Sequence, residues 1–187
     1  LDTTGFNNTI GSLSGGGTSG GNVLLGSATL TIGSDNTSTT FSGAISGAGG
    51  ITKSGNGALT LAASNPYTGT TSITSGTLKA GIASTAFGTN SALTLANSSG
   101  VLLDITGFNN TIGSLSGGGT SGGNVLLGSA TLTIGSDNTS TTFSGAISGA
   151  GGITKSGNGT LTLAGSNPYT GTTSITSGTL KAGVRAE

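Results

Sequence analysis

The chain of 187 residues contains no cysteine, histidine, methionine or tryptophan, and charged residues make up only 5% of it. Soluble domains carry roughly 25% charged residues, so this chain has few ionisable groups with which to build a site. Without histidine and cysteine, the Ser/His/Asp and Cys/His arrangements of nucleophilic catalysis and the disulfide bond are all excluded. Most familiar enzyme chemistry is therefore absent before any motif is considered.

The few charges that are present cancel, because five basic and five acidic residues give a net charge of zero. A nucleic-acid-binding surface needs clustered basic side chains to neutralise phosphates, and the basic residues here are widely spaced. No apolar run approaches the roughly 20 residues of a membrane-spanning helix. We therefore predict no nucleic-acid partner and no membrane insertion by this segment. Since the chain opens without methionine or a signal peptide, we expect it to be a mature segment of something longer.

Glycine is abundant, with 39 residues, and the chain copies itself. Residues 1–82 match residues 103–184 at an offset of 102, and residues 83–102 complete the unit. The four differences are Thr3/Ile105, Ala58/Thr160, Ala63/Gly165 and Ile82/Val184. Self-similarity at a fixed period is typical of repeat architectures. We predict one continuous structure over residues 1–187, with a first repeat unit at 1–102 and a second, truncated unit at 103–187.

Apolar residues alternate with threonine in runs such as ATLTIG (28–33) and ALTLA (58–62 and 92–96). This period of two is typical of β-strands. Shorter strands are predicted at VLLG, TFSGAISG, GITKSG, TSITSG, TLKAG and LLDITG, separated by corners such as GGGTSGGN, GSDN, GAGG and SGNG. No window has the apolar spacing of a helix, so the chain is predicted to be all-β.

Among tandem all-β architectures, a propeller needs recurring aromatic signatures and a string of sandwiches needs larger apolar residues than this chain supplies. A β-solenoid needs only two to four inward apolar residues per rung. We predict a parallel β-solenoid with roughly 20–25 residues per turn and about eight or nine rungs. A flexible Gly/Ser/Thr linker is the alternative, mainly at GGGTSGGN, but the regular Leu/Ile alternation argues against it.

Residues 47–81, GAGGITKSGNGALTLAASNPYTGTTSITSGTLKAG, and their copy at 149–183 resemble the autotransporter-associated β-strand repeat, or passenger-associated transport repeat. LDTTGFNNTIGSLSG (1–15) is similar to the companion segment between such repeats. The resemblance implies a right-handed parallel β-helix, exported by a Gram-negative bacterium to its outer-membrane surface or the medium. Pro66 and Pro168 depart from the usual pattern, and they must lie in a corner because proline cannot donate to a sheet ladder.

Side chains that could carry chemistry are few. Each unit has two aspartates, Asp2 and Asp35 with their copies Asp104 and Asp137, and Glu187 is terminal. We interpret Asp35 as a turn residue and expect Asp2 and Asp104 to point outward from a strand. Neither a calcium-binding nonapeptide nor a phosphate loop is present. We therefore predict that the chain is not an enzyme, with no catalytic residue, no metal site and no cofactor.

The side chains best able to anchor a ligand are Tyr67, Tyr169, Phe6 and Phe108, with the tyrosines the weak candidates for a binding site. The competing and favoured interpretation is that one aromatic per corner plugs the end of a rung. Lys53, Lys79 and their copies are predicted on the solvent side of their strands, where they discourage sideways sheet pairing.

The copied unit and the lack of a catalytic group predict a rigid stalk or spacer in a surface-exposed or secreted autotransporter adhesin. The alternative is a building block of an extracellular filament, in which units associate end to end. A third possibility is ice binding by outward threonines at rung spacing. Neighbouring repeats of the same protein are the expected partners, and the host or cell-surface ligand is left unidentified.

Overall fold

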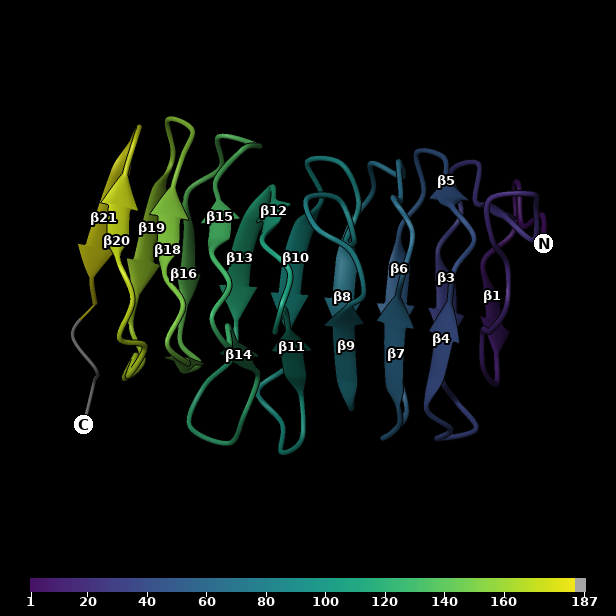
Figure 1. Cartoon of the computed structure of the whole chain (residues 1–187), viewed down its shortest axis with the longest axis horizontal. Helices are drawn as coiled ribbons and strands as arrows, with labels where there is room; N and C mark the ends of the chain where they lie inside the picture. Colours follow the sequence, from purple (N-terminus) through teal and green to yellow (C-terminus); the bar gives the residue numbers. More distant parts are fainter. Residues whose placement is uncertain (184–187) are drawn as a thin grey trace.

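Strands of two to four residues alternate with corners throughout residues 1–183, which are the residues that the computed structural model describes. Successive turns of the chain stack along one long axis, in sequence order from one end to the other (Figure 1). No helix occurs among these residues, and hence none that is long and apolar enough to cross a membrane. The predicted all-β solenoid is confirmed.

Three faces of parallel strands run along the axis, and we number them in the order in which the chain visits them. Face 1 is a nine-stranded sheet of β1 (Asn8–Ile10), β3 (Leu30–Ile32), β6 (Ile51–Lys53), β8 (Thr71–Ile73), β10 (Ala92–Leu95), β13 (Ser114–Gly117), β16 (Thr141–Phe143), β19 (Thr160–Leu163) and β21 (Thr179–Ala182). Face 2 is a six-stranded sheet of β4 (Thr39–Phe41), β7 (Ala58–Leu61), β9 (Thr77–Ala80), β11 (Leu102–Asp104), β14 (Asn124–Leu126) and β17 (Ile147–Ser148).

Face 3 is built from two shorter sheets. The first holds β2 (Val23–Leu24) and β5 (Ile45–Ser46), and the second holds β12 (Asn110–Ile112), β15 (Leu132–Ile134), β18 (Ile153–Lys155) and β20 (Thr173–Ile175). Between them the chain continues through irregular rungs, in which the Tyr67 amide donates to the Ile45 carbonyl and Ser84 forms a parallel bridge with Asn110. One face therefore tolerates irregular backbone while the stacking continues.

The register confirms the predicted size of a turn. Partner residues on neighbouring rungs lie between 19 positions apart, as in Leu161↔Leu180, and 26 apart, as in Gly117↔Phe143. Nine strands on face 1 are separated by eight such steps, so the described residues make about eight turns.

The core follows from the alternation within each strand. Leu30 and Ile32 are buried while Thr31 between them is half-exposed, and Leu59 and Leu61 flank Thr60 in the same way. Stacked rungs join these inward residues into one cluster that continues from Val23 to Leu161. Burying each leucine or isoleucine stabilises the fold by about 1.5–3 kcal/mol, which short strands could not achieve alone.

The corners pack backbone against backbone, which explains the glycine content. Gly55 has a φ of +65°, and a Cβ atom placed there would collide with the Gly33 carbonyl of the preceding rung. Beside it, the Asn36 Oδ1 accepts a hydrogen bond from the Asn56 amide at 2.9 Å. Only glycine combines this conformation with so close an approach.

The two copies of the repeat occupy different faces. Strands β3, β6 and β8 lie on face 1, whereas their copies β15, β18 and β20 lie on face 3. Likewise β4, β7 and β9 lie on face 2 and their copies β16, β19 and β21 on face 1, while β2 and β5 lie on face 3 and their copies β14 and β17 on face 2. The second copy is thus shifted around the axis by one face.

Counting faces gives the length of the unit in turns. From Asn8 in β1, register partners on face 1 follow at Leu30, Ile51, Thr71 and Leu93, which makes four complete turns. The chain then crosses face 2 at Leu102 and reaches face 3 at Asn110, the copy of Asn8. One 102-residue unit therefore makes four and two-thirds turns.

Candidate functional site

Tyr67 is completely buried, with 0% of its surface exposed. Its hydroxyl pairs with the Thr71 hydroxyl at 2.7 Å, and Thr71 also pairs with the Ser91 hydroxyl at 2.9 Å. Burial raises the pKa of the Tyr67 hydroxyl far above its usual value. The ring fills the interior of a rung and presents no surface to a ligand, as a plug would. Tyr169 is partly buried against the core, and its hydroxyl pairs with that of Thr173 at 2.6 Å.

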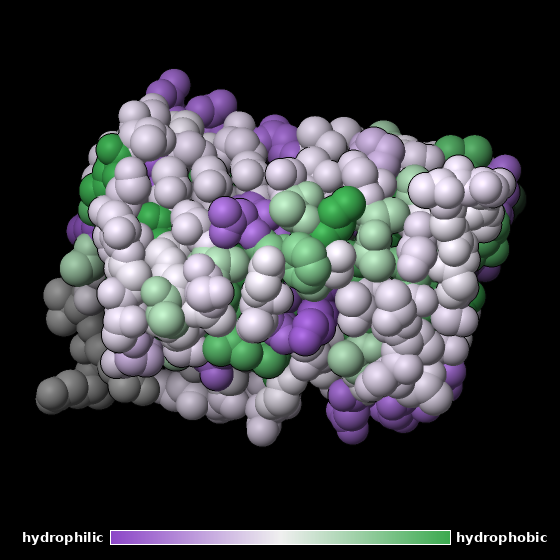
Figure 2. Space-filling view, viewed as in Figure 1, coloured by the Kyte–Doolittle hydropathy of each residue, from purple (hydrophilic) through white to green (hydrophobic). Residues whose placement is uncertain are grey.

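The two phenylalanines at copied positions are exposed instead. Phe6 is 76% exposed and Phe108 is 37% exposed, each on a TGFNN turn in which its amide donates to the carbonyl three residues earlier. The expectation that these aromatics plug a rung is wrong, because the preceding glycine (φ +87° and +88°) turns the side chain away from the axis. Figure 2 shows a mostly pale surface with scattered apolar and polar residues and no continuous band of either kind.

Two lysines lie inside the solenoid, contrary to the prediction that they face solvent. Lys53 and Lys155 are each 1% exposed because they occupy the inward position of β6 and β18 after Ile51 and Ile153. The Lys53 Nζ donates to the carbonyls of Ser54, Gly55 and Ser75 at 2.5, 2.8 and 3.3 Å. The Lys155 Nζ donates to the carbonyls of Ser156 and Gly157. Burial lowers the pKa of both lysines.

The second pair of lysines behaves as predicted. Lys79 on β9 has a side chain that is 42% exposed, and Lys181 on β21 is exposed. Arg185 and Glu187 lie outside the described residues.

The aspartates have local structural partners. The Asp35 Oδ1 accepts hydrogen bonds from the Thr37 amide at 3.0 Å and the Thr37 hydroxyl at 2.8 Å, which confirms the turn interpretation and lowers the Asp35 pKa. Asp2 is exposed as expected. Its copy Asp104 is buried, contrary to expectation, because Lys79 on the preceding rung covers it and binds its Oδ2 at 3.2 Å.

A column of hydroxyls follows the outer surface of face 1. Register partners along it are Thr9, Thr31, Thr52, Ser72, Thr94 and Ser116, one on each rung. The hydroxyls of Thr94 and Ser116 pair at 2.9 Å. Ice binding by outward threonines stays a prediction, and this column is the part of the surface to which that prediction refers.

The GGGTSGG segment forms a hydrogen-bonded hairpin loop in each copy. In the second copy, the Gly119 amide donates to the Gly122 carbonyl at 2.9 Å, and Thr120 and Ser121 stand exposed at the tip. The first copy has the same bridge between Gly17 and Gly20. The second loop also rests on the loop after β10, since the Asn97 Oδ1 accepts from the Ser121 amide at 2.9 Å.

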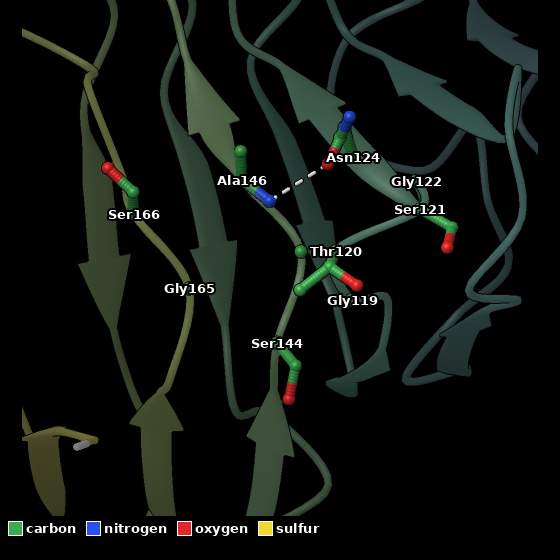
Figure 3. A pocket seen from close by; sticks show the side chains of 10 residues that line it. Gly119, Thr120, Ser121, Gly122, Asn124, Ser144, Ala146, Gly165 and Ser166 are labelled. Carbon is green, nitrogen blue, oxygen red and sulfur yellow. Dashed lines mark hydrogen bonds between the residues drawn. The ribbon is translucent and has the colours of Figure 1, made fainter. Parts of the chain in front are cut away.

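A hollow of about 240 Å³ lies beside this hairpin loop (Figure 3). The residues that line it are Gly119, Thr120, Ser121, Gly122, Asn124, Ser144, Gly145, Ala146, Gly165 and Ser166. The Asn124 Oδ1 accepts a hydrogen bond from the Ala146 amide at 2.9 Å, which leaves the Asn124 amide nitrogen as a donor. The lining offers hydroxyl and amide groups and no charged or aromatic side chain.

This hollow can hydrogen-bond a neutral polar group, but it contains no acid, base or activated nucleophile. Within residues 1–183 no group of three or more carboxylates comes together that could hold a metal ion. The arrangement defines a structural repeat, with short parallel rungs around a continuous core and polar corners between the strands.

Residues 51–80 and 153–182 match the model of the passenger-associated-transport-repeat family. The first match runs from the start of β6 to the end of β9 and the second from β18 to β21, so each covers the same rungs of its copy. The chain therefore carries two repeats of this family, one in each copy.

The chain is also similar to the adhesin BmaC autotransporter of Brucella suis biovar 1 (strain 1330), with 46% identity over 147 residues. The matched region is 78% of this chain and 4% of that relative, so the chain spans a small part of the relative's length. No solved structure matches the chain significantly.

Proposed function

We propose that this chain is a rigid stalk or spacer segment of a bacterial autotransporter adhesin, displayed at the cell surface or released outside the cell. The single observation that carries the proposal is the continuity of the joint between the two copies. Strand β10 of the first unit pairs with β13 of the second over four residues, and β11 pairs with β9 on one side and β14 on the other. The buried residues Val101, Leu103 and Ile105 extend the core across it.

A joint that is stacked like the interior lets copies be added without a flexible hinge. Rungs lie about 4.8 Å apart, so each unit of four and two-thirds turns adds about 22 Å of rod. The resemblance to an adhesin autotransporter supports a place in an exported passenger. Filament assembly and ice binding stay predictions.

The test is a surface-displayed passenger that carries zero, one, two or three copies of residues 1–102 between its membrane anchor and an epitope tag. We expect the height of the tag above the membrane, measured by gold labelling and electron microscopy, to rise linearly with copy number. A Gly/Ser linker of matched length is the control, because a flexible coil extends only with the square root of its length. Square-root growth in the repeat series would contradict the stalk.

A further inference from the structure

We infer that the 102-residue unit is a screw element, so that each added copy turns the stalk and everything it displays by one third of a turn. The inference rests on the register of the rungs and deepens the proposed stalk function. Nine strands of the first copy, β1 to β9, have a counterpart in the second, and all nine counterparts lie on another face. The unit makes four complete turns and two thirds of another, so a copied position is rotated about the axis by two thirds of a turn in the winding direction. This gives the same orientation as a rotation by one third of a turn in the opposite direction.

The joint sets this rotation, because the register inside each copy is the same. Asn8 pairs with Leu30 in the first copy, and Asn110 pairs with Leu132 in the second. Residues 83–102 place Leu93 on face 1 and Leu102 on face 2, so the first strand of the second copy follows on face 3. A joint that was one face longer would have brought the copies into line.

Exposed features of the unit therefore point in different directions in successive copies. The hairpin loop of the first copy leads from the face 2 bridge at Gly15 to β2 on face 3. The loop of the second copy leads from β13 on face 1 to β14 on face 2. In Figure 1 this second loop hangs below the rungs next to the β14 label. The exposed Phe6 and Phe108 are separated by the same rotation.

The rotation has a repeat of its own. Three units of four and two-thirds turns make fourteen turns, so the same feature faces the same side again after about 67 Å. A partner that approaches from one side meets an identical surface on every third copy, and the array as a whole offers that surface on three sides. A partner can therefore bind such a stalk at any rotation of the stalk about its own axis.

The absence of cysteine makes this measurable by spin labelling, since every introduced thiol is unique. We would prepare the whole chain with Thr9→Cys and Thr111→Cys, which are copied positions on faces 1 and 3. The matched control is Thr9→Cys with Ser116→Cys, which share the outer column of face 1. Interspin distances would be measured by pulsed dipolar spectroscopy, with circular dichroism to verify that each variant is folded.

We expect the pair of labels that lies closer along the axis to have the longer interspin distance. Thr9 and Ser116 are five turns apart, or about 24 Å along the axis, and Thr9 and Thr111 only about 22 Å. Because the second pair is also displaced sideways between faces, its distance should be longer than the control by roughly 5 Å. A Thr9–Thr111 distance equal to or shorter than the control would overturn the inference. If the proposed stalk function failed in the cell-surface test, this interspin distance would still be as expected. Failure of the stalk and failure of the inferred rotation can therefore be distinguished.

Discussion

The buried lysine of the repeat is the residue that departs most from a neutral, hydroxyl-rich design. Lys53 follows an inward isoleucine, and its ammonium group ends in a corner where three carbonyls converge. No acidic side chain within residues 1–183 lies in ion-pair contact with it. The hydrogen bonds to the carbonyls therefore have to offset the loss of hydration that lowers its pKa. We interpret Lys53 and its copy as internal clamps on the SGNG corner.

Replacing this lysine tests the clamp. Lys53→Met keeps most of the side-chain length but leaves buried carbonyls without a donor, so the free energy of unfolding should fall by about 2 kcal/mol. Urea unfolding of the whole chain, followed by circular dichroism, measures the change. Lys79→Met is the control, because its side chain is 42% exposed and its one ion pair, with Asp104, should contribute only about 1 kcal/mol. Equal losses in the two variants would show that Lys53 does not act as a clamp.

At the residue scale, the sequence predicts the environment of a side chain when its hydrogen-bond partners lie close by in the sequence. The Asp35 turn was predictable because its acceptor and donors lie within two residues. The burial of Lys53 was not, since charge argued for solvent and the alternation Ile51-Thr52-Lys53 argued for the interior. The alternation was the better guide, because a long stem can carry the ammonium to a corner. Phe6 is the opposite case, because its apolar ring predicts burial but its turn directs the ring outward.

At the scale of elements, the joint is where identical sequences meet different neighbours. Asp2 and Asp104 occupy copied positions, yet only Asp104 on β11 lies next to Lys79 on β9. Burial alone would raise the pKa of Asp104, but hydrogen bonds from Thr106 and the pairing with Lys79 outweigh it, and the pKa is lowered. The ion pair therefore ties the end of the first unit to the start of the second.

This pairing gives the joint a pH dependence of known sign. Because the folded pKa of Asp104 lies below its ordinary value of 3.8, the stabilisation is complete above that value and is lost as pH falls through the folded pKa. Asp104→Asn should therefore destabilise the chain at pH 7, by up to about 1 kcal/mol, and by less at pH 2. Urea unfolding at both pH values measures this difference. Asp2→Asn, without a lysine partner, should show a smaller effect at pH 7, and the same loss in both variants would contradict the assignment.

Most strands were predictable from alternation, and the exceptions have a physical reason. ATLTIG and both ALTLA runs form β3, β7 and β10, because each offers two inward apolar residues. β1 and its copy β12 contain one apolar residue each, so NTI gives no alternation to read. β13 ends at Gly117, where the chain leaves for the hairpin loop. These strands form because neighbouring rungs supply a template, which is information outside their own sequence.

At the scale of the whole molecule, the repeat predicts a solenoid, but it does not predict how far one copy is rotated about the axis relative to the next. A turn of roughly 20–25 residues allows a 102-residue unit to make anything between about four and five turns. The actual number of turns depends on the lengths of the corners, because these make the number of residues per turn vary from 19 to 26. Local pattern does not determine these lengths, so the one-face shift between copies became visible only in the structure.

The central claim is that the copies form one continuous rod, and small-angle X-ray scattering of two chains tests it most directly. One is the chain of 187 residues, and the other carries an additional copy of residues 1–102 at its start. We expect the maximum dimension to grow by about 22 Å while the radius of gyration of the cross-section stays constant. A larger cross-section without that increase in length would contradict it, because the added copy would then have folded beside the rod and not onto its end.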